Sequence, residues 1–190
     1  MTTVSELAAR AKESSYILAA LAPEIKDRAL NAMACAMRVH ADEILAANAL
    51  DLQEAKHAVD AGKMKPALYE RLKLTRDKLE TVIKGVEELV DLPDPVGRVM
   101  AATELDEGLA LYKVSCPIGL IGVIFEARPD VVPQIAALAV KSGNAVVLKG
   151  GKEAAHTNEA LTRTLKNALA SVPGYPAESL QLIHTREESA

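Results

Sequence analysis

The sequence contains no tryptophan, few other aromatic residues, two cysteines and no excess of positive charge. Aromatic residues make up only 3% of the chain, so an aliphatic core rich in alanine is expected. The net charge of −4 excludes a general affinity for nucleic acid, because neutralising phosphates requires a basic surface. No run of about 18 apolar residues occurs, so no membrane span is expected. The first residues, MTTVSELAARAKE, lack the apolar segment of a secretory signal.

The two cysteines, Cys35 and Cys116, show no CxxC spacing and have no histidine nearby in the sequence, so no metal site is predicted. Cys35 lies in the helical pattern NAMACAMRV and is expected to be a small core residue. Cys116 is expected to pack at the entry to a strand. Two isolated cysteines without a signal peptide fit a reducing compartment, and we therefore predict a cytoplasmic protein.

Residues 1–97 are expected to be helical. Their helix-start signals are Thr3 (with Glu6 as a capping box), Pro23, Pro66 and Thr75. The stretch after Pro23 stays amphipathic to about Ala61, where Gly62 is expected to end it. The segment DLPDPVG, residues 91–97, holds two prolines and a glycine and is a clear break in the pattern.

The period of the pattern then changes. Residues 98–117 contain two extended runs around Asp-Glu-Gly, which predicts a β-hairpin arm. Residues 118–190 alternate between apolar runs and helical patterns, with helices expected from about Pro129 and Lys152. This spacing predicts a parallel βαβαβ unit with right-handed crossovers and strands covered on both faces. Three parallel strands make a poor free-standing sheet, so this α/β chain is expected to be an incomplete part of a longer protein.

The glycine pair in KGGKEA, residues 149–154, does not complete a known phosphate-binding motif. The P-loop pattern fails because Val146 replaces a glycine and Glu153 replaces the serine or threonine that would bind magnesium. The stretch PIGLIG does not match GxGxxG, so the usual dinucleotide fingerprint is absent. Judged locally, the two glycines favour a tight turn from a strand into a helix.

The positions of charged residues favour a binding site. Residues 126–130 (EARPD) and residues 149–152 (KGGK) both follow strands, and ligands of open parallel sheets bind beyond the carboxyl ends of the strands. Two lysines and Arg128 beside helix N-termini would favour phosphate groups, and these segments are expected to face one crevice. The alternative for Arg128 is an ion pair with Glu126 or Asp130.

The stretch CPIGLIGVIFEARPDVVPQIAALAVKSGNAVVLKGGKEA resembles the signature of the γ-glutamyl phosphate reductase family, also called glutamate-5-semialdehyde dehydrogenase. The likeness extends to the NALDLQEAK, RLKLT and DLPDPVG segments and covers essentially the whole chain. This family belongs to the aldehyde dehydrogenase superfamily, whose Rossmann-like domain binds a nicotinamide cofactor without GxGxxG. The resemblance implies NADPH-dependent reduction of γ-glutamyl phosphate to glutamate-5-semialdehyde, a step of proline biosynthesis.

The resemblance also assigns expected roles to residues at the strand ends. Arg128 falls where other superfamily members carry an asparagine that helps to hold the thioester oxyanion, and it would bind the acyl phosphate. Lys149 matches a lysine that reaches the adenosine ribose. Lys152 stands where NAD-preferring members carry glutamate, so it would favour NADPH; the alternative is a solvated residue at a helix start. The expected cofactor-binding residues are Phe125, Glu126, Ala127, Lys149, Gly150, Gly151 and Lys152. The hairpin matches the superfamily's oligomerisation arm, which implies a homo-oligomer.

The family's catalytic cysteine is expected beyond Ala190, in a separate domain that this chain lacks. The implied mechanism is attack of a cysteine thiolate on the acyl phosphate, loss of phosphate and hydride transfer from NADPH to the thioester. The chain would then be an inactive fragment, with glutamate kinase as a candidate partner. The alternatives are a stand-alone nucleotide-binding or assembly module without catalysis, and another acyl-phosphate or aldehyde reductase of the superfamily.

Overall fold

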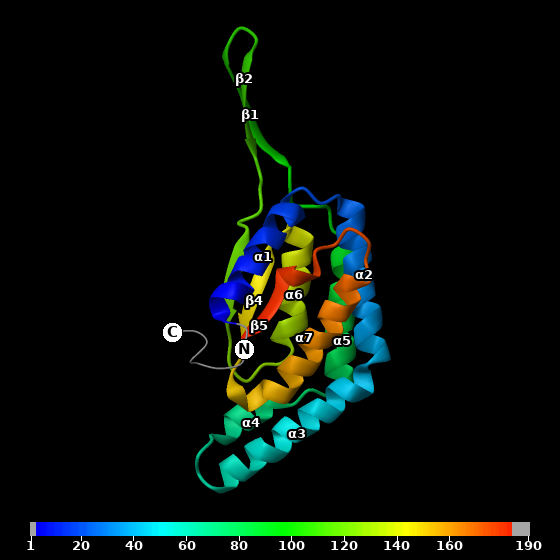
Figure 1. Ribbon diagram of the computed structural model, residues 1–190, viewed down its shortest axis with the longest axis vertical. Helices are drawn as coiled ribbons and strands as arrows, with labels where there is room; N and C mark the ends of the chain where they lie inside the picture. The colour runs from blue at the N-terminus through cyan, green and yellow to red at the C-terminus, as the bar shows by residue number, and fades with distance from the viewer. Residues whose placement is uncertain (1–2, 184–190) are drawn as a thin grey trace.

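The computed structural model describes residues 3–183 of the chain as an α/β domain from which a hairpin projects (Figure 1). A three-stranded sheet lies at the centre. Helix α1 (Val4–Ala19) packs against its strands, while α6 (Val131–Ser142) and α7 (Ala155–Ala170) connect the strands and pack on them. Helices α2 (Pro23–Val39) and α5 (Arg76–Asp91) form a further layer against α6 and α7. The helices of the first 97 residues and the sheet therefore share one main hydrophobic core.

The helix-start signals of the first 97 residues are confirmed. Thr3 and Glu6 form the predicted capping box, and the Thr75 side chain caps α5 by accepting the Lys78 N–H at 3.2 Å. Helix α4 spans Pro66–Leu72. The continuous stretch expected from Pro23 to Ala61 is wrong, however, because the chain breaks at His40 (φ −96°, ψ 18°) and α3 spans Ala41–Asp60.

The break at His40 allows two apolar faces to be buried in different places. Helix α2 buries Met33 and Met37 against α5, α6 and α7, whereas α3 turns its buried face toward α4 and the start of α7. One straight helix could not reach both surfaces. The sequence conceals the break, since His40 ends α2 and begins α3 without a proline or glycine.

The parallel sheet has the order β3-β4-β5, with β3 at Leu120–Ile124, β4 at Ala145–Lys149 and β5 at Leu180–Ile183. The predicted βαβαβ unit is thus confirmed, and Gly143 ends α6 in the left-handed conformation (φ 69°). A 3-10 turn, Lys152–Ala154, precedes α7. The expectation that both faces of every strand are covered is wrong for β3, an edge strand of this sheet whose Ile124 is 79% exposed.

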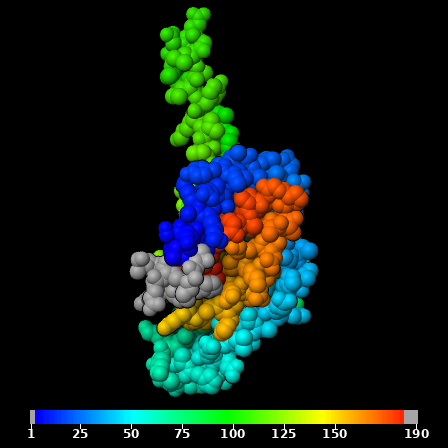
Figure 2. Space-filling view, viewed as in Figure 1, coloured from blue at the N-terminus to red at the C-terminus, as the bar shows by residue number. Residues whose placement is uncertain are grey.

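The predicted hairpin is confirmed as β1 (Val99–Asp106) and β2 (Leu109–Val114), which pair antiparallel. Gly108, at φ 75°, supplies the left-handed residue that its tight turn requires. Every residue of both strands is exposed, and the hairpin extends well clear of the body (Figure 2). The exposed large apolar side chains of the arm are Val99, Met100, Leu105, Leu109, Leu111, Tyr112 and Val114.

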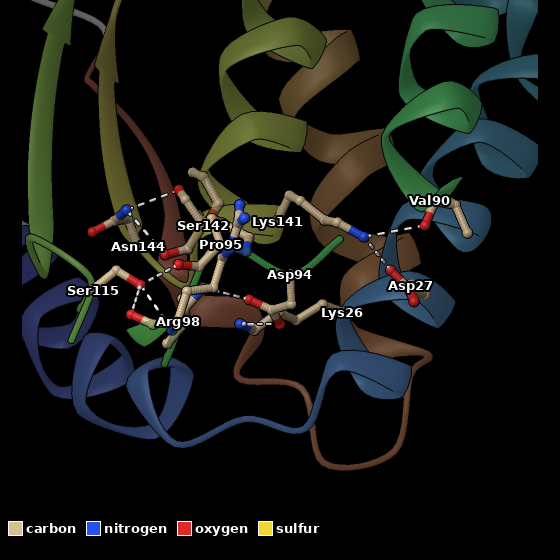
Figure 3. A network of polar contacts seen from close by, with 12 residues as sticks. Lys26, Asp27, Val90, Asp94, Pro95, Arg98, Ser115, Lys141, Ser142 and Asn144 are labelled. Carbon is tan, nitrogen blue, oxygen red and sulfur yellow. Dashed lines mark hydrogen bonds and ion pairs between the residues drawn. The ribbon is translucent and has the colours of Figure 1, made fainter. Parts of the chain in front are cut away.

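Polar contacts fix the base of the arm to the body (Figure 3). Lys26 of α2, only 1% exposed, donates to Asp94 at 2.8 Å, and the other carboxylate oxygen of Asp94 accepts the Val96 N–H at 2.8 Å. Across the base of the hairpin, the Ser115 hydroxyl accepts the Arg98 N–H at 3.0 Å. The part-buried contacts of Asp94 therefore anchor the base of the arm to the body, although the arm itself is solvated.

The expected burial of the two cysteines is wrong, because Cys35 and Cys116 are both exposed. Cys35 lies on the solvent side of α2, next to the buried Ala34, so one position along the helix decides its exposure. Cys116 precedes β3, which is an edge strand and has a neighbouring strand on one side only. Within residues 3–183, no helix combines the length and apolarity needed to cross a bilayer.

Candidate functional site

The two predicted binding segments lie next to each other at the carboxyl ends of β3 and β4. The Phe125 N–H donates to the Lys149 carbonyl at 3.1 Å, which extends the pairing of the strands by one step. Beyond this bond, residues 126–130 turn toward α6 and residues 150–154 turn toward α7. Parallel pairing therefore brings together charges that are about 20 positions apart in the sequence.

The turn after β4 is closely packed around its glycines. A Cβ atom on Gly150 would lie 2.2 Å from Asn158 Nδ2 and 3.2 Å from the Phe125 ring. Gly150 is therefore required for space, because a methyl group there would displace the buried Asn158. Of the two lysines that flank the glycines, Lys149 is half-buried and Lys152 is exposed.

A carboxylate that the sequence analysis treated only as a mismatch joins the two turns. Glu153 Oε1 accepts the Ala127 N–H at 2.8 Å. Ala127 is 1% exposed and has φ 43°, the only positive φ of a non-glycine residue among residues 3–183. Its neighbours Glu126 and Arg128 are exposed, and Pro129 is buried. The position of Glu153 shortly after a strand is a signal that it could contribute to the site. Nothing in the local sequence pattern, however, predicts that its partner is the Ala127 N–H.

The N-terminus of α7 is occupied by a side chain from α3. Asp51, 2% exposed, accepts the N–H groups of His156 at 3.1 Å and Thr157 at 2.8 Å, and also the Thr157 hydroxyl proton. These two N–H groups are thus already bonded and are not available to a phosphate. The phosphate site expected beside the helix N-termini therefore stays a prediction, and it depends on Lys149, Lys152 and Arg128 rather than on these two donors of α7.

Asn48, one turn before Asp51 on α3, extends this buried network to the link between α4 and α5. Its side chain donates to the Leu72 carbonyl at 2.9 Å and accepts the Leu74 N–H at 3.0 Å. It also donates to the Thr157 hydroxyl at 3.2 Å. The backbone on both sides of Lys73 is therefore held firmly against α3 and the start of α7.

Arg128 lines an open cleft of about 600 Å³ between the α4–α5 region and the turn after β3. Four of the lining side chains are cationic and three are anionic. The lining residues are Glu70, Arg71, Lys73, Leu74, Asp77, Lys78, Thr81, Val82, Arg128, Asp130 and Gln134. Lys149 and Lys152 do not line it, so the lysines and Arg128 do not share this cleft as the sequence analysis expected.

The charges that face the cleft are partly paired. The Arg128 guanidinium, 61% exposed, lies 3.6 Å from Asp130, so the alternative predicted for Arg128 is present as a long, solvated ion pair. Lys73 donates to Glu70 at 2.6 Å, and this hydrogen bond raises the pKa of Lys73. Such exposed pairs are weak and can exchange their partner for a ligand anion at little cost.

No cysteine lies at these strand ends among the described residues. Cys116 precedes β3, so it lies at the amino ends of the strands, opposite to the candidate site. Cys35 belongs to α2. Within residues 3–183, no group of three histidine, cysteine, aspartate or glutamate side chains could hold a metal ion. The predicted position of the catalytic cysteine, beyond Ala190, lies outside the described residues.

Comparison with known proteins shows which proteins this chain is similar to. No family model matches the chain. A gamma-glutamyl phosphate reductase of Methanococcoides burtonii is 48% identical over 187 residues, which are 98% of this chain and 42% of the relative. The crystal structure of gamma-glutamyl phosphate reductase from Saccharomyces cerevisiae is 38% identical, with a TM-score of 0.91 over 98% of this chain and 47% of that one. The enzyme of that name from Thermotoga maritima is 32% identical, with a TM-score of 0.90 over 98% and 44% of the two chains.

More distant structures share the fold alone. A putative aldehyde dehydrogenase of Bacillus subtilis, 17% identical, superimposes with a TM-score of 0.69 over 96% of this chain. The chain spans less than half of the length of each of these proteins. Over nearly all of its own length, the chain is therefore similar to proteins named gamma-glutamyl phosphate reductase, and it spans 42% and 40% of the length of two of them.

Proposed function

We propose that this chain is the cofactor-binding part of an oxidoreductase that reduces γ-glutamyl phosphate to glutamate-5-semialdehyde with NADPH, in the biosynthesis of proline. The observation that carries the proposal is the 48% identity, over 98% of the chain, to a protein named gamma-glutamyl phosphate reductase. The geometry supports it, because cationic side chains lie at the carboxyl ends of parallel strands. We infer a cytoplasmic location from the same resemblance.

The cofactor would lie along the two turns after β3 and β4. The residues that would hold it are Phe125, Glu126, Ala127, Lys149, Gly150, Gly151 and Lys152. Their chemistry fits a nucleotide, because the two lysines can neutralise phosphate groups. Bound NADPH would supply a hydride. Since Asp51 already accepts the N–H groups of His156 and Thr157, we expect the two lysine side chains to receive a phosphate there.

The substrate would enter the cleft that contains Arg128. An acyl phosphate is anionic, and the Arg128 guanidinium can form two parallel hydrogen bonds with it once Asp130 is displaced. Lys73 and Lys78, from the α4–α5 region, add positive charge to the same cleft. The nucleophile of the implied mechanism, a cysteine thiolate, would come from a part of the protein that this chain does not contain, with phosphate as the leaving group.

The hairpin arm supports a further proposal, that the protein assembles into a homo-oligomer. An isolated two-stranded hairpin is marginally stable in water, and this one exposes large apolar residues along both strands. Contact with a second subunit would cover them. Glutamate kinase stays a candidate partner by resemblance.

The test of the proposed cofactor is a calorimetric titration, in which the 190-residue chain is titrated with NADPH and, separately, with NADH. Lys152→Glu is expected to weaken NADPH binding by about ten- to a hundredfold and to change NADH binding little, since a charge-assisted contact with the 2′-phosphate is lost. Lys84→Glu, an equal charge change at an exposed position of α5, is the control. Equal small changes for both cofactors would leave Lys152 without a role in selection.

Turnover separates the proposal from its alternative, a nucleotide-binding or assembly module without chemistry. The 190-residue chain alone is expected to give no NADPH when supplied with NADP, glutamate semialdehyde and phosphate. A longer protein that continues into a cysteine-bearing domain is expected to turn over, and replacing that cysteine should abolish the activity. Robust turnover by the 190-residue chain would mean that the nucleophile has been misplaced.

A further inference from the structure

Ala127 holds a strained backbone conformation that its surroundings must maintain. At φ 43° it lies in the left-handed region, which side chains with a Cβ atom rarely adopt. Its methyl group is buried in a small cluster with Ala55, Leu72 and Ala154. Strain of this kind persists only where neighbouring groups over-determine it, and it is often found at functional sites.

The polar group that holds Ala127 is the carboxylate of Glu153, which accepts its N–H at 2.8 Å. The position of that carboxylate depends on Gly151, because a Cβ atom at residue 151 would lie 2.0 Å from Glu153 Oε1. Gly151 has φ −68°, which any residue can adopt, so space rather than backbone conformation requires the glycine. Gly151 thus leaves the space that the Glu153 carboxylate occupies, and this carboxylate links the turn after β4 to the turn after β3.

The conformation of Ala127 decides where the next residue points. Arg128 lies between the buried residues Ala127 and Pro129, and its carbonyl accepts the Val131 N–H at 3.0 Å at the start of α6. With both neighbours anchored, the Arg128 side chain is left to project into the cleft. If the turn at Ala127 relaxed to an ordinary conformation, the direction of Arg128 would change with it.

We propose that Glu153 is a positioning residue, whose carboxylate holds the Ala127 turn and thereby directs Arg128 into the cleft. The turn that carries Lys149 and Lys152 is by this contact mechanically joined to the turn that carries Arg128. The role given to Arg128 rests on the proposed function, but the contact between the turns does not.

The experiment is amide hydrogen exchange, measured by NMR on the 190-residue chain. Glu153→Ala is expected to speed exchange of the Ala127 N–H by about tenfold or more and to shift the Arg128 amide signal, because the acceptor is lost. Glu153→Gln keeps an acceptor oxygen of the same reach, so it should restore exchange to within about threefold of the parent. Amides in the middle of β4 serve as the internal control and should not change.

Gly151→Ala displaces the carboxylate without removing its charge, and it keeps the test valid if Glu153→Ala fails to fold. Its Cβ meets only the far end of a flexible side chain, so the fold should persist while Ala127 exchange rises as in Glu153→Ala. In the Glu153→Ala background, Gly151→Ala should add nothing further, since both changes remove one contact.

Unchanged Ala127 exchange in Glu153→Ala or in Gly151→Ala would overturn the proposal, and so would a Glu153→Gln variant that behaves like Glu153→Ala. Neither substrate nor cofactor takes part in these measurements. The contact between the turns can therefore be established even if the proposed reductase function fails, and the reverse is equally possible.

Discussion

Replacing Asp51 with alanine should destabilise the domain more than its place in the middle of a helix suggests. Its buried carboxylate accepts three hydrogen bonds from the first residues of α7. The Asp51→Ala change leaves the N–H and hydroxyl of Thr157, a residue 0% exposed, without these acceptors. An N-cap is worth about 0.5–2 kcal/mol, and a hydrogen bond to a charged group about 1.5–3 kcal/mol.

These contributions overlap, because one carboxylate provides all of them. We therefore expect Asp51→Ala to lower the free energy of unfolding by about 3–4 kcal/mol, out of a total of about 5–15 kcal/mol for a domain. Asp51→Asn keeps one acceptor oxygen and should lose about half as much. Glu54→Ala, on the exposed side of the same helix, is the matched control and should change nothing measurable.

The assay is urea unfolding at 25 °C followed by far-UV circular dichroism, with linear extrapolation of the free energy and comparison of the slopes. Equal slopes would show that the variants unfold between the same two states. A loss in Asp51→Ala no larger than that in Glu54→Ala would refute the reasoning, because it would mean that water or another side chain satisfies α7 equally well.

Three further changes test other parts of the domain. Burial raises the pKa of Tyr175 to about 12, so as the pH rises the unfolded chain loses the phenol proton before the folded chain does. The free energy of unfolding of the parent should therefore fall by about 2–3 kcal/mol between pH 10 and 12. Tyr175→Phe should remove this loss in urea titrations at alkaline pH. Lys26→Ala leaves the half-buried Asp94 unpaired and should cost about 3 kcal/mol in the same assay at pH 7; a cost below about 1 kcal/mol would contradict it. Gly150→Ala should displace Asn158, cost about 1–3 kcal/mol and lower the melting temperature, and an unchanged transition would disprove the packing argument.

The sequence predicts most elements of the fold because their signals are local. The hairpin follows from Asp106 to Gly108 between two extended runs, and the βαβαβ unit follows from apolar runs separated by helical patterns. The break at His40 is missed because amphipathic spacing continues through it. The exposure of Cys35 is missed because neighbouring positions on a helix can face the core and the solvent. In a stretch with so many apolar residues, the sequence does not determine how the helix is rotated about its axis.

The candidate site is predicted only in part, for a different reason. Arg128 and the two lysines can be found because they follow strands of a predicted parallel sheet. Asp51 and Glu153 act through bonds to backbone groups 105 and 26 positions away, and such contacts leave no periodic trace. A signal for Asp51 does exist in retrospect, since it lies at helical spacing with Ile44, Asn48 and Ala55 on the buried face of α3.

The packing of α1 on the sheet imposes an order of events on protein synthesis. Helix α1 ends at Ala19, but its partner β4 spans Ala145–Lys149, so 130 residues must be added before the strand is complete. At about 5–20 residues per second, the ribosome needs roughly 6–26 s for that interval. During that time the buried side of α1, with Ala11 and Leu18, lacks the strand that covers it. A nascent chain arrested shortly before Ala145 should therefore bind chaperones, whereas one arrested well after Ile183 should release them.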